Sequence, residues 1–259
     1  MRHSLFIVIL ILLTSCSVPT TSIIATQPSS QTPSLFPTVT PTKAAAATKT
    51  SAPTPTLIPG FEDWSVLNPE YVDIKTENGS LILTLKHRAL WFMNQHGVLV
   101  YKAVTGNFKI TADVYTSKNS DPTQPPGGNG SVQLGGVMAR NGDSGRENYV
   151  FIVVGDDGDG LSVETKTTQN AESKFEGPAW DSPNAELRLC RFGEAFTAYK
   201  RHVGTNEAWT LAKTFDRPDL PDMLQVGVNI YTDSEPDLQI RYNNIAIQPI
   251  SSEADCPAD

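Results

Sequence analysis

Residues 147–168 read ENYVFIVVGDDGDGLSVETKTT, and this stretch decides the fold class. The segment over 148–155, with a continuous apolar run from 149 to 154, and the segment over 161–168 both suit β-strands. Between them lies the short segment GDDGDG (155–160), which we call the Asp-Gly knot. Asp and Gly tolerate the positive φ angles of tight turns. The stretch therefore predicts a β-hairpin whose turn lies within 155–160.

The same knot is a candidate metal site through Asp156, Asp157 and Asp159. A linear calcium loop supplies oxygen ligands at alternate positions and a bidentate Glu at its twelfth position. Counted from Asp157, the fifth, seventh and twelfth positions carry Leu, Val and Thr, so this pattern fails. We interpret the knot mainly as a turn and keep calcium as an open alternative; no other cofactor is expected.

Strand-like segments recur along the chain from residue 80 to residue 247. They are short and are separated by turn residues such as Asn78-Gly79 and Gly193-Glu194. We find no convincing long amphipathic helix, so the pattern predicts an all-β fold, a sandwich of two packed antiparallel sheets. The other predicted strands are 80–87, 108–116, 185–192, 195–202, 224–232 and 238–247.

The order of several motifs resembles the concanavalin A-like lectin/glucanase superfamily, particularly its laminin-G-like jelly-roll domains in bacterial proteins. These motifs include WSVLNPEYVDIKTENGSLILTL (64–85), VTGNFKITADV (104–114), LGGVMAR (134–140) and ELRLCRFGEAFTAYKR (186–201). The resemblance extends over nearly all of residues 60–249 and rests on the order and spacing of the motifs. It implies a two-sheet jelly roll with one concave and one convex face.

The first residues indicate where the protein is located. A basic start precedes the apolar run Leu5–Leu13, which is too short to cross a bilayer of about 30 Å and suits the core of a signal peptide. The run ends in Leu-Thr-Ser-Cys16, which resembles a bacterial lipobox. This resemblance implies a signal peptide over 1–15 and a lipid anchor on Cys16; an ordinary secretory signal is the alternative. We expect a lipid-anchored protein of the bacterial cell envelope, outside the cytoplasm.

Composition divides the rest of the chain into a tether and a domain. Pro, Thr, Ser and Ala make 31 of the 43 residues over 17–59, so we expect 16–59 to be a lipidated Cys followed by a disordered tether. Residues 60–259 are long enough for one domain with a core. They carry 28 acidic against 17 basic residues, a net charge of −11, which argues against nucleic acid or an anionic lipid surface as a partner.

Catalytic motifs are not found. Glucanases of the concanavalin A-like fold resemble one another in a Glu-x-Asp-x-Glu strand, because their acid and nucleophile must flank one bond. Here the nearest acidic strand residue is Glu164, and the position two residues later, where the pattern needs Asp, carries Lys166. Nucleophile-elbow and zinc-protease motifs are also lacking. Enzyme activity is therefore the less favoured interpretation.

The cysteines other than Cys16 form an even pair. In an oxidising compartment Cys190 and Cys256 are expected to form a disulfide that fastens the C-terminal tail to the strand near 186–192. Two free thiols are the alternative.

Strand alternation suggests a binding face. Three strands show apolar residues at alternate positions, which we assign to the core: Val137 and Ala139, Val163, and Leu187 and Leu189. The residues next to them in each strand then point to the opposite face. If the three strands are adjacent, the neighbours form one charged cluster: Arg140, Glu164, Lys166 and Arg188, bordered by Asn148, Tyr149 and Trp180. A solvated face with cross-strand ion pairs is the alternative.

The remaining tryptophans are expected to differ in burial according to the segments in which they lie. Trp64 and Trp209 are expected in the core, and Trp91 is expected, like Trp180, to be exposed near loops that contain Pro or Gly.

The favoured function is non-catalytic binding of an extracellular glycan by a surface-anchored protein. Arg140 and Arg188 favour an acidic sugar, because a guanidinium pairs with a carboxylate. The alternative is a structural or protein-interaction module of the envelope without glycan binding, and a glycoside-active enzyme is third.

Overall fold

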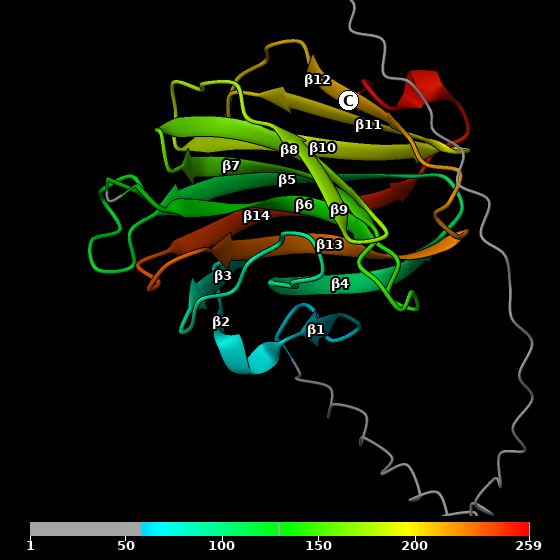
Figure 1. Ribbon diagram of the computed structural model, residues 1–259. Coiled ribbons are helices and arrows are strands. Elements are labelled where there is room, and N and C mark those ends of the chain that lie inside the picture. The colour runs from blue at the N-terminus through cyan, green and yellow to red at the C-terminus, as the bar shows by residue number, and fades with distance from the viewer. Residues whose placement is uncertain (1–57, 129, 259) are drawn as a thin grey trace, which may run out of the picture. The chain divides into compact units, whose positions relative to one another are not determined.

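The structure is a computed structural model that describes residues 58–128 and 130–258 (Figure 1). The predicted signal peptide, Cys16 and nearly all of the predicted tether lie outside these residues. The described part contains fourteen strands and two short 3-10 helices, η1 (Pro69–Tyr71) and η2 (Glu253–Asp255). None of the helices within it is long and apolar enough to cross a bilayer.

Seven strands form sheet A, in the order β1-β4-β13-β6-β7-β8-β9, and every neighbouring pair is antiparallel. In this order the bounds are β1 Ser65–Leu67, β4 Val98–Thr105, β13 Met223–Thr232, β6 Val132–Arg140, β7 Tyr149–Asp157, β8 Leu161–Gln169 and β9 Glu172–Glu176.

Seven strands also form sheet B, in the order β12-β11-β10-β5-β14-β3-β2, again with antiparallel pairs. In this order the bounds are β12 Thr210–Asp216, β11 Ala195–Arg201, β10 Asn184–Phe192, β5 Phe108–Ser117, β14 Gln239–Pro249, β3 Ser80–Leu85 and β2 Val72–Glu77.

The main core lies between the two sheets. Along β5 every second residue, from Phe108 to Val114, is fully buried, which is the period-two pattern of a strand with one face on a core. Opposite it, β7 contributes Val150, Ile152 and Val154 to the same cluster. The predicted all-β jelly roll, a sandwich of two antiparallel sheets, is confirmed.

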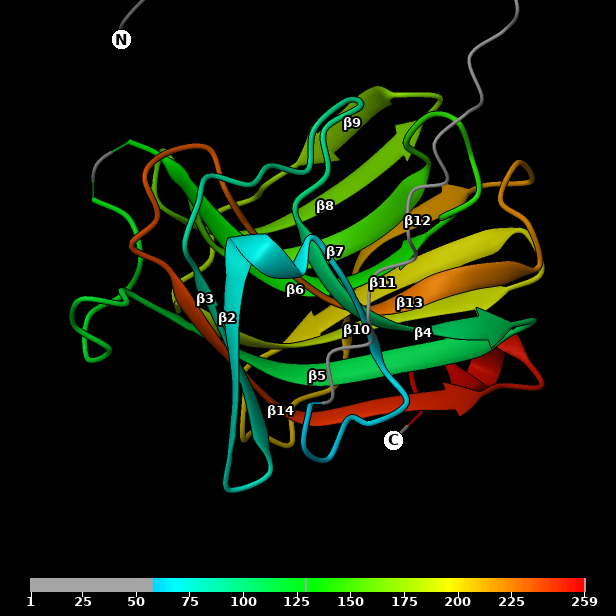
Figure 2. The ribbon, with the colours of Figure 1, turned by 90° about the horizontal axis from the view of Figure 1, so that it is seen from below.

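A second apolar cluster covers the other face of sheet A. The connection between β3 and β4, residues 86–97, bends across this face and reaches towards β9 (Figure 2). It brings Trp91 onto Tyr149, Phe151 and Tyr231, all of which are fully buried. Strand β7 is therefore buried on both faces, which explains why its sequence is a continuous apolar run rather than an alternating one.

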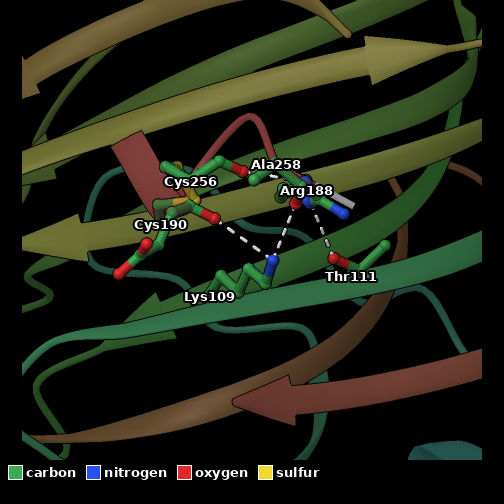
Figure 3. Close-up of a disulfide and its surroundings, with 7 residues drawn as sticks. Lys109, Thr111, Arg188, Cys190, Cys256 and Ala258 are labelled. Atoms are coloured by element: carbon green, nitrogen blue, oxygen red, sulfur yellow. Dashed lines mark hydrogen bonds between the residues drawn. A yellow bond between two sulfur atoms is a disulfide. The ribbon is translucent and has the colours of Figure 1, made fainter. Parts of the chain in front are cut away.

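The C-terminal tail is fastened to the outer face of sheet B. Cys190 on β10 forms a disulfide with Cys256, which lies 66 positions later in the sequence, and the two Cα atoms are 6.0 Å apart, so the predicted pairing is confirmed. Figure 3 shows Arg188 and Lys109 reaching the tail beside this disulfide. Arg188 donates to the carbonyl oxygens of Cys256 and Ala258, at 2.8 Å each.

Candidate functional site

The Asp-Gly knot is the turn of the β7–β8 hairpin, as predicted. The backbone N–H of Asp157 donates to the carbonyl oxygen of Gly160 at 3.0 Å and closes the turn. The carboxylates of Asp156 and Asp157 accept the N–H groups of Gly158 and Asp159, at 2.8 and 3.1 Å. Each carboxylate thus caps the backbone two residues further on, which is the usual local role of Asp in a turn.

The three turn carboxylates do not converge on one point that would suit a cation. Among residues 58–128 and 130–258, no three His, Cys, Asp or Glu side chains are grouped so that they would hold a metal ion. The calcium alternative for Asp156, Asp157 and Asp159 gains no support from this geometry.

Glu164 and Lys166 lie on β8 with their side chains on the outer face of sheet A, because Val163, which directly precedes Glu164, is in the core. This orientation agrees with the alternation. The solvated-face alternative does not hold for these two residues, since each is only 4% exposed. Trp91 and Phe92 of the connection over 86–97 and the side chain of Phe175 on β9 pack around Lys166. Tyr231 contacts Glu164.

The ammonium group of Lys166 is enclosed by aromatic rings. Its Nζ lies 3.0 Å from Oε1 of Glu164 and donates to the carbonyl oxygen of Trp91 at 3.1 Å. Burial lowers the pKa of Lys166, and the adjacent Glu164 carboxylate opposes this shift. Four ring centroids lie 5.0 to 5.8 Å from Nζ, those of Phe92, Phe151, Phe175 and Tyr231, so cation–π attraction adds to the ion pair.

Tyr231 on β13 completes a buried polar cluster with these two residues. Its hydroxyl donates to Oε1 of Glu164 at 2.9 Å. Burial, and next the negative charge of Glu164, raise the pKa of Tyr231 well above its ordinary value, so the hydroxyl stays protonated and acts as a donor. Glu164, Lys166 and Tyr231 form what we call the polar cluster.

A hollow of about 360 Å³ lies over the polar cluster. Phe92 and Phe175 form one wall, with ring centroids 6.4 Å apart in an edge-to-face arrangement. Phe175 is 56% exposed, so its ring is open to solvent at the edge of the hollow. The hollow is lined by Leu90, Phe92, Val132, Asp157, Asp159, Glu164, Lys166, Phe175, Gly177, Tyr231 and Asp233.

Two other hollows are slightly larger, at about 440 and 420 Å³. The first is lined in part by Arg217, whose guanidinium is already bonded to Asp219, to the carbonyl of Tyr149 and to Thr167. The second lies beside the loop that contains Pro122 and Pro125. Neither combines a wall of two aromatic rings with a buried charged floor, so the hollow over the polar cluster is the better candidate site.

Arg140 lies on the outer face of sheet A but not in the hollow. It makes a bidentate contact with Glu147, and its Nη1 donates to Oε1 of Gln225 at 2.7 Å. The side chain is 7% exposed. Its hydrogen-bonding capacity is therefore directed at protein groups.

The position of Arg188 shows that the predicted charged cluster is wrong. It lies on β10 in sheet B, whereas Arg140, Glu164 and Lys166 lie on sheet A, so the four residues do not share a face. The alternation was correct for each strand, but strand adjacency was not. Besides contacting the tail, Arg188 packs 4.0 Å from the ring centroid of Trp209. Trp209 is only partly buried, so the prediction that it belongs to the core is wrong.

The predicted border residues also lie away from the hollow. Asn148 is buried, and its Oδ1 accepts the N–H of Asn170 at 2.8 Å. Tyr149 is buried against Trp91, with ring centroids 5.3 Å apart, which also contradicts the expected exposure of Trp91. Trp180 stacks on His202 at 4.4 Å. Trp64, by contrast, is in the core as expected.

The sequence patterns did not predict the aromatic wall of the hollow or Asp233, one of the acidic residues that line it. Phe92 and Phe175 belong to a connection and to an edge strand that the strand pattern did not predict. Asp233 directly follows β13 and belongs to no motif that would single it out. The one available signal was the pair of aromatic residues in Leu-Trp-Phe (90–92), which is an unusual composition for an exposed connection.

Comparisons with known proteins support the fold. No protein-family model matches the chain, and no curated protein matches it. Among solved structures, a functionally unknown protein from Saccharomyces cerevisiae is 14% identical, covers 74% of this chain and 99% of its own, and has a TM-score of 0.60. A GH43 protein from Bacillus licheniformis is 12% identical, with a TM-score of 0.53 over 73% of this chain.

A third similar structure is a xylan β-1,4-xylosidase from Bacillus halodurans, 14% identical with a TM-score of 0.50 over 74% of this chain. This chain spans 37% and 38% of the lengths of the GH43 protein and the xylosidase. At these identities the likeness shows a shared jelly-roll β-sandwich, a fold that also occurs in proteins acting on carbohydrates.

Proposed function

We propose that this protein binds a carbohydrate, without catalysis, in the hollow over the polar cluster. One observation carries the proposal: Phe92 and Phe175 border a hollow whose floor is the buried Glu164–Lys166–Tyr231 cluster. Binding sites of this kind combine apolar walls with a few polar groups that fix the ligand's orientation.

The chemistry of a sugar suits such a hollow. A sugar ring presents C–H groups on its faces and hydroxyl groups around its edge. The exposed ring of Phe175 offers a flat apolar surface for a sugar face, and the carboxylates that line the hollow accept hydrogen bonds from hydroxyls. Because the polar cluster is held by its own hydrogen bonds, its orientation costs little additional ordering when the ligand binds.

The shared fold is compatible with this proposal but does not carry it. The GH43 protein and the β-1,4-xylosidase are much longer than this chain, and their activities are not transferred to it. We further propose, from the lipobox resemblance at Cys16 and the composition of 17–59, that the domain is held at the bacterial cell envelope by a lipid anchor and a tether.

A glycan array probed with the purified full-length protein tests the proposal, with Phe175→Ala as the site variant. We expect Phe175→Ala to weaken binding of the selected glycan by about tenfold, because about 1–2 kcal/mol of apolar contact is lost. Leu211→Ala on β12 is the matched control, since Leu211 is 55% exposed on sheet B, and it should leave the affinity unchanged.

Failure to bind any glycan on the array would oppose the proposal and would favour the envelope protein-interaction module. Equal loss of affinity in the Phe175 and Leu211 variants would also oppose it, because the effect would then not be specific to the hollow.

Hydrolysis is the second candidate function, because the fold brings Asp157, Glu164 and Asp233 to one hollow from separate parts of the sequence. Sequence spacing did not reveal this convergence. Mass spectrometry of the bound glycan after prolonged incubation decides between the two functions. The proposed non-catalytic role predicts an unchanged glycan, whereas shortened products that disappear in Glu164→Gln would establish hydrolysis.

A further inference from the structure

We infer that the ligand of the hollow carries a positively charged amine, as in hexosamine sugars whose amino groups are not acetylated. This inference rests on the proposed function, because it names the chemical class of the carbohydrate. It reverses the preference for acidic sugars that the arginine residues suggested from the sequence.

The charge around the hollow is strongly negative. Four carboxylates line it, those of Asp157, Asp159, Glu164 and Asp233, against the single ammonium group of Lys166. That ammonium is already paired with Glu164 at 3.0 Å and enclosed by rings. The three aspartates are therefore left as the uncompensated charges that a ligand meets, and an anionic sugar would be repelled by them.

Two of these aspartates retain an acceptor for a ligand. Asp157 uses Oδ1 for the N–H of Asp159, and Asp233 uses Oδ1 for the N–H of Val132 at 2.9 Å. Within residues 58–128 and 130–258 we find no donor to the Oδ2 atom of either carboxylate. An ammonium group has three donors and no acceptor, so it can pair with such oxygens directly.

An unsatisfied hydroxyl lies beside the same space. Oγ of Ser162 is buried and has no hydrogen-bond partner among the described residues. It lies 3.6 Å from the point that a Cβ atom would occupy at Gly177, which lines the hollow, and Oδ2 of Asp157 lies 3.1 Å from that point. A polar ligand group that enters beside Gly177 would meet Oδ2 of Asp157, which lines the hollow. The Ser162 hydroxyl lies directly behind this point, and because buried polar groups are nearly always paired, it marks a place that lacks one polar partner.

An organic cation fits this arrangement better than a metal ion. The carboxylates lie around the hollow and are not grouped so that three of them, within the described part of the chain, would hold one metal ion. The rings of Phe92 and Phe175 add a surface on which an ammonium group is stabilised by cation–π attraction. A sugar that carries an amine uses the carboxylates and the rings together.

The two arginines that favoured an acidic sugar do not contribute to this hollow. Arg140 is bonded to Glu147 and Gln225, and Arg188 lies on the opposite sheet, bonded to the C-terminal tail. Neither guanidinium lines the hollow.

The test compares three oligosaccharides of equal length on the full-length protein by isothermal titration calorimetry. They are a glucosamine hexamer, its fully N-acetylated counterpart and a uronic acid hexamer. At a pH where the amine is charged, we expect the glucosamine hexamer to bind at least about tenfold more tightly than the acetylated one. Added salt should reduce this preference, and so should a rise in pH through the pKa of the ligand's amine.

Variants separate the charge effect from damage to the fold. Asp157→Asn with Asp233→Asn keeps an acceptor oxygen for each backbone N–H but removes both charges, so it should abolish the preference for the amine. The matched control is Glu70→Gln with Glu194→Gln, which removes two exposed charges elsewhere and should keep the preference. Gly177→Ala should weaken the binding of both neutral and cationic hexamers, because its methyl group enters the space beside Asp157.

The outcomes distinguish this inference from the function on which it rests. Equal binding of the acetylated and free hexamers, or tighter binding of the uronic acid hexamer, would overturn the inference and leave carbohydrate binding intact. Failure of all three hexamers and of every glycan on the array would overturn both.

Discussion

Lys166 and Glu164 form an ion pair that is almost entirely shielded from water, and this makes each dependent on the other. Replacing Lys166 by Met leaves the Glu164 carboxylate buried without a countercharge. We expect Lys166→Met to lower the free energy of unfolding by about 3–5 kcal/mol, measured by urea denaturation. Replacing both residues, Lys166→Met with Glu164→Gln, should cost clearly less than the single change.

The matched control for this pair is Lys75→Met, which breaks an exposed ion pair with Glu77 on β2. Its expected cost is below about 1 kcal/mol. If Lys166→Met cost no more than this control, the ammonium would not be the countercharge of a buried carboxylate, and the description of the polar cluster would be wrong.

The side chain of His202 is also held in place by charged neighbours. Its Nε2 lies 2.9 Å from Asp181, and its Nδ1 lies 2.9 Å from Glu207. Hydrogen bonds to Asp181 and then Glu207 raise the pKa of His202, while the pKa values of both carboxylates are lowered. The contacts hold the 202–207 turn against Trp180, which stacks on the imidazole.

The direction of each shift sets the pH range of this contact. A raised histidine pKa gives a stabilising contribution that is complete below the ordinary value of 6.5 and is lost as the pH rises through the folded value. The lowered carboxylate pKa values give a stabilising contribution that is lost as the pH falls below about 4.5. The contact should therefore be strongest between these limits. An NMR titration of the His202 ring should show a pKa above 6.5 that falls in Asp181→Asn; an unchanged value in this variant would refute the pairing.

The disulfide between Cys190 and Cys256 fixes an entire element, the C-terminal tail, on sheet B. In the chain-entropy model a closed loop of this length stabilises the fold by about 4 kcal/mol. We expect Cys190→Ser with Cys256→Ser to lower Tm by about 10 °C, measured by thermal unfolding without reductant. Reductant should lower the Tm of the parent protein towards that of the variant and leave the variant unchanged. A parent protein that is insensitive to reductant after full reduction, checked by mass spectrometry, would contradict this prediction.

Local sequence patterns were sufficient for most of the strands. Segments such as 108–116 and 224–232 show their strand character through β-branched residues and turn residues at their ends, and they correspond to β5 and β13. Strand β4 was not predicted, although its first residues are apolar and buried. Strands β1, β2, β9 and β12 were not predicted because they are short, polar or partly exposed edge elements with little hydrophobic pattern. Their strand conformation comes from pairing with a neighbour and is not encoded in their own pattern.

The site could be predicted only in part, because it depends on which strands are neighbours. Alternation correctly placed Glu164 and Lys166 on the outer face of one strand. It could not show that β10 belongs to the other sheet, which removes Arg188 from the cluster. It also could not show that residues 86–97 cross sheet A and bury Trp91, since this contact joins Trp91 to residues such as Tyr149, far along the sequence.

The molecule as a whole treats its two outer faces differently. On sheet B, the C-terminal tail with its disulfide lies over β10 and β5 (Figure 3). On sheet A, the connection over 86–97 covers part of the face and leaves the hollow open beside β9. The covered part of sheet A gives the hollow a rigid floor, because the polar cluster rests on buried aromatic residues.

The central claim is that the hollow on sheet A is where a carbohydrate binds. An NMR titration of the isotope-labelled full-length protein with the tightest-binding glycan of the array tests it most directly. The account predicts that backbone amide shifts change around the β7–β8 turn (157–160), around Glu164–Lys166, at Phe175 and at Asp233, while β10 and β11 remain unaffected. Shift changes confined to sheet B, or to the surroundings of Arg140, would contradict it.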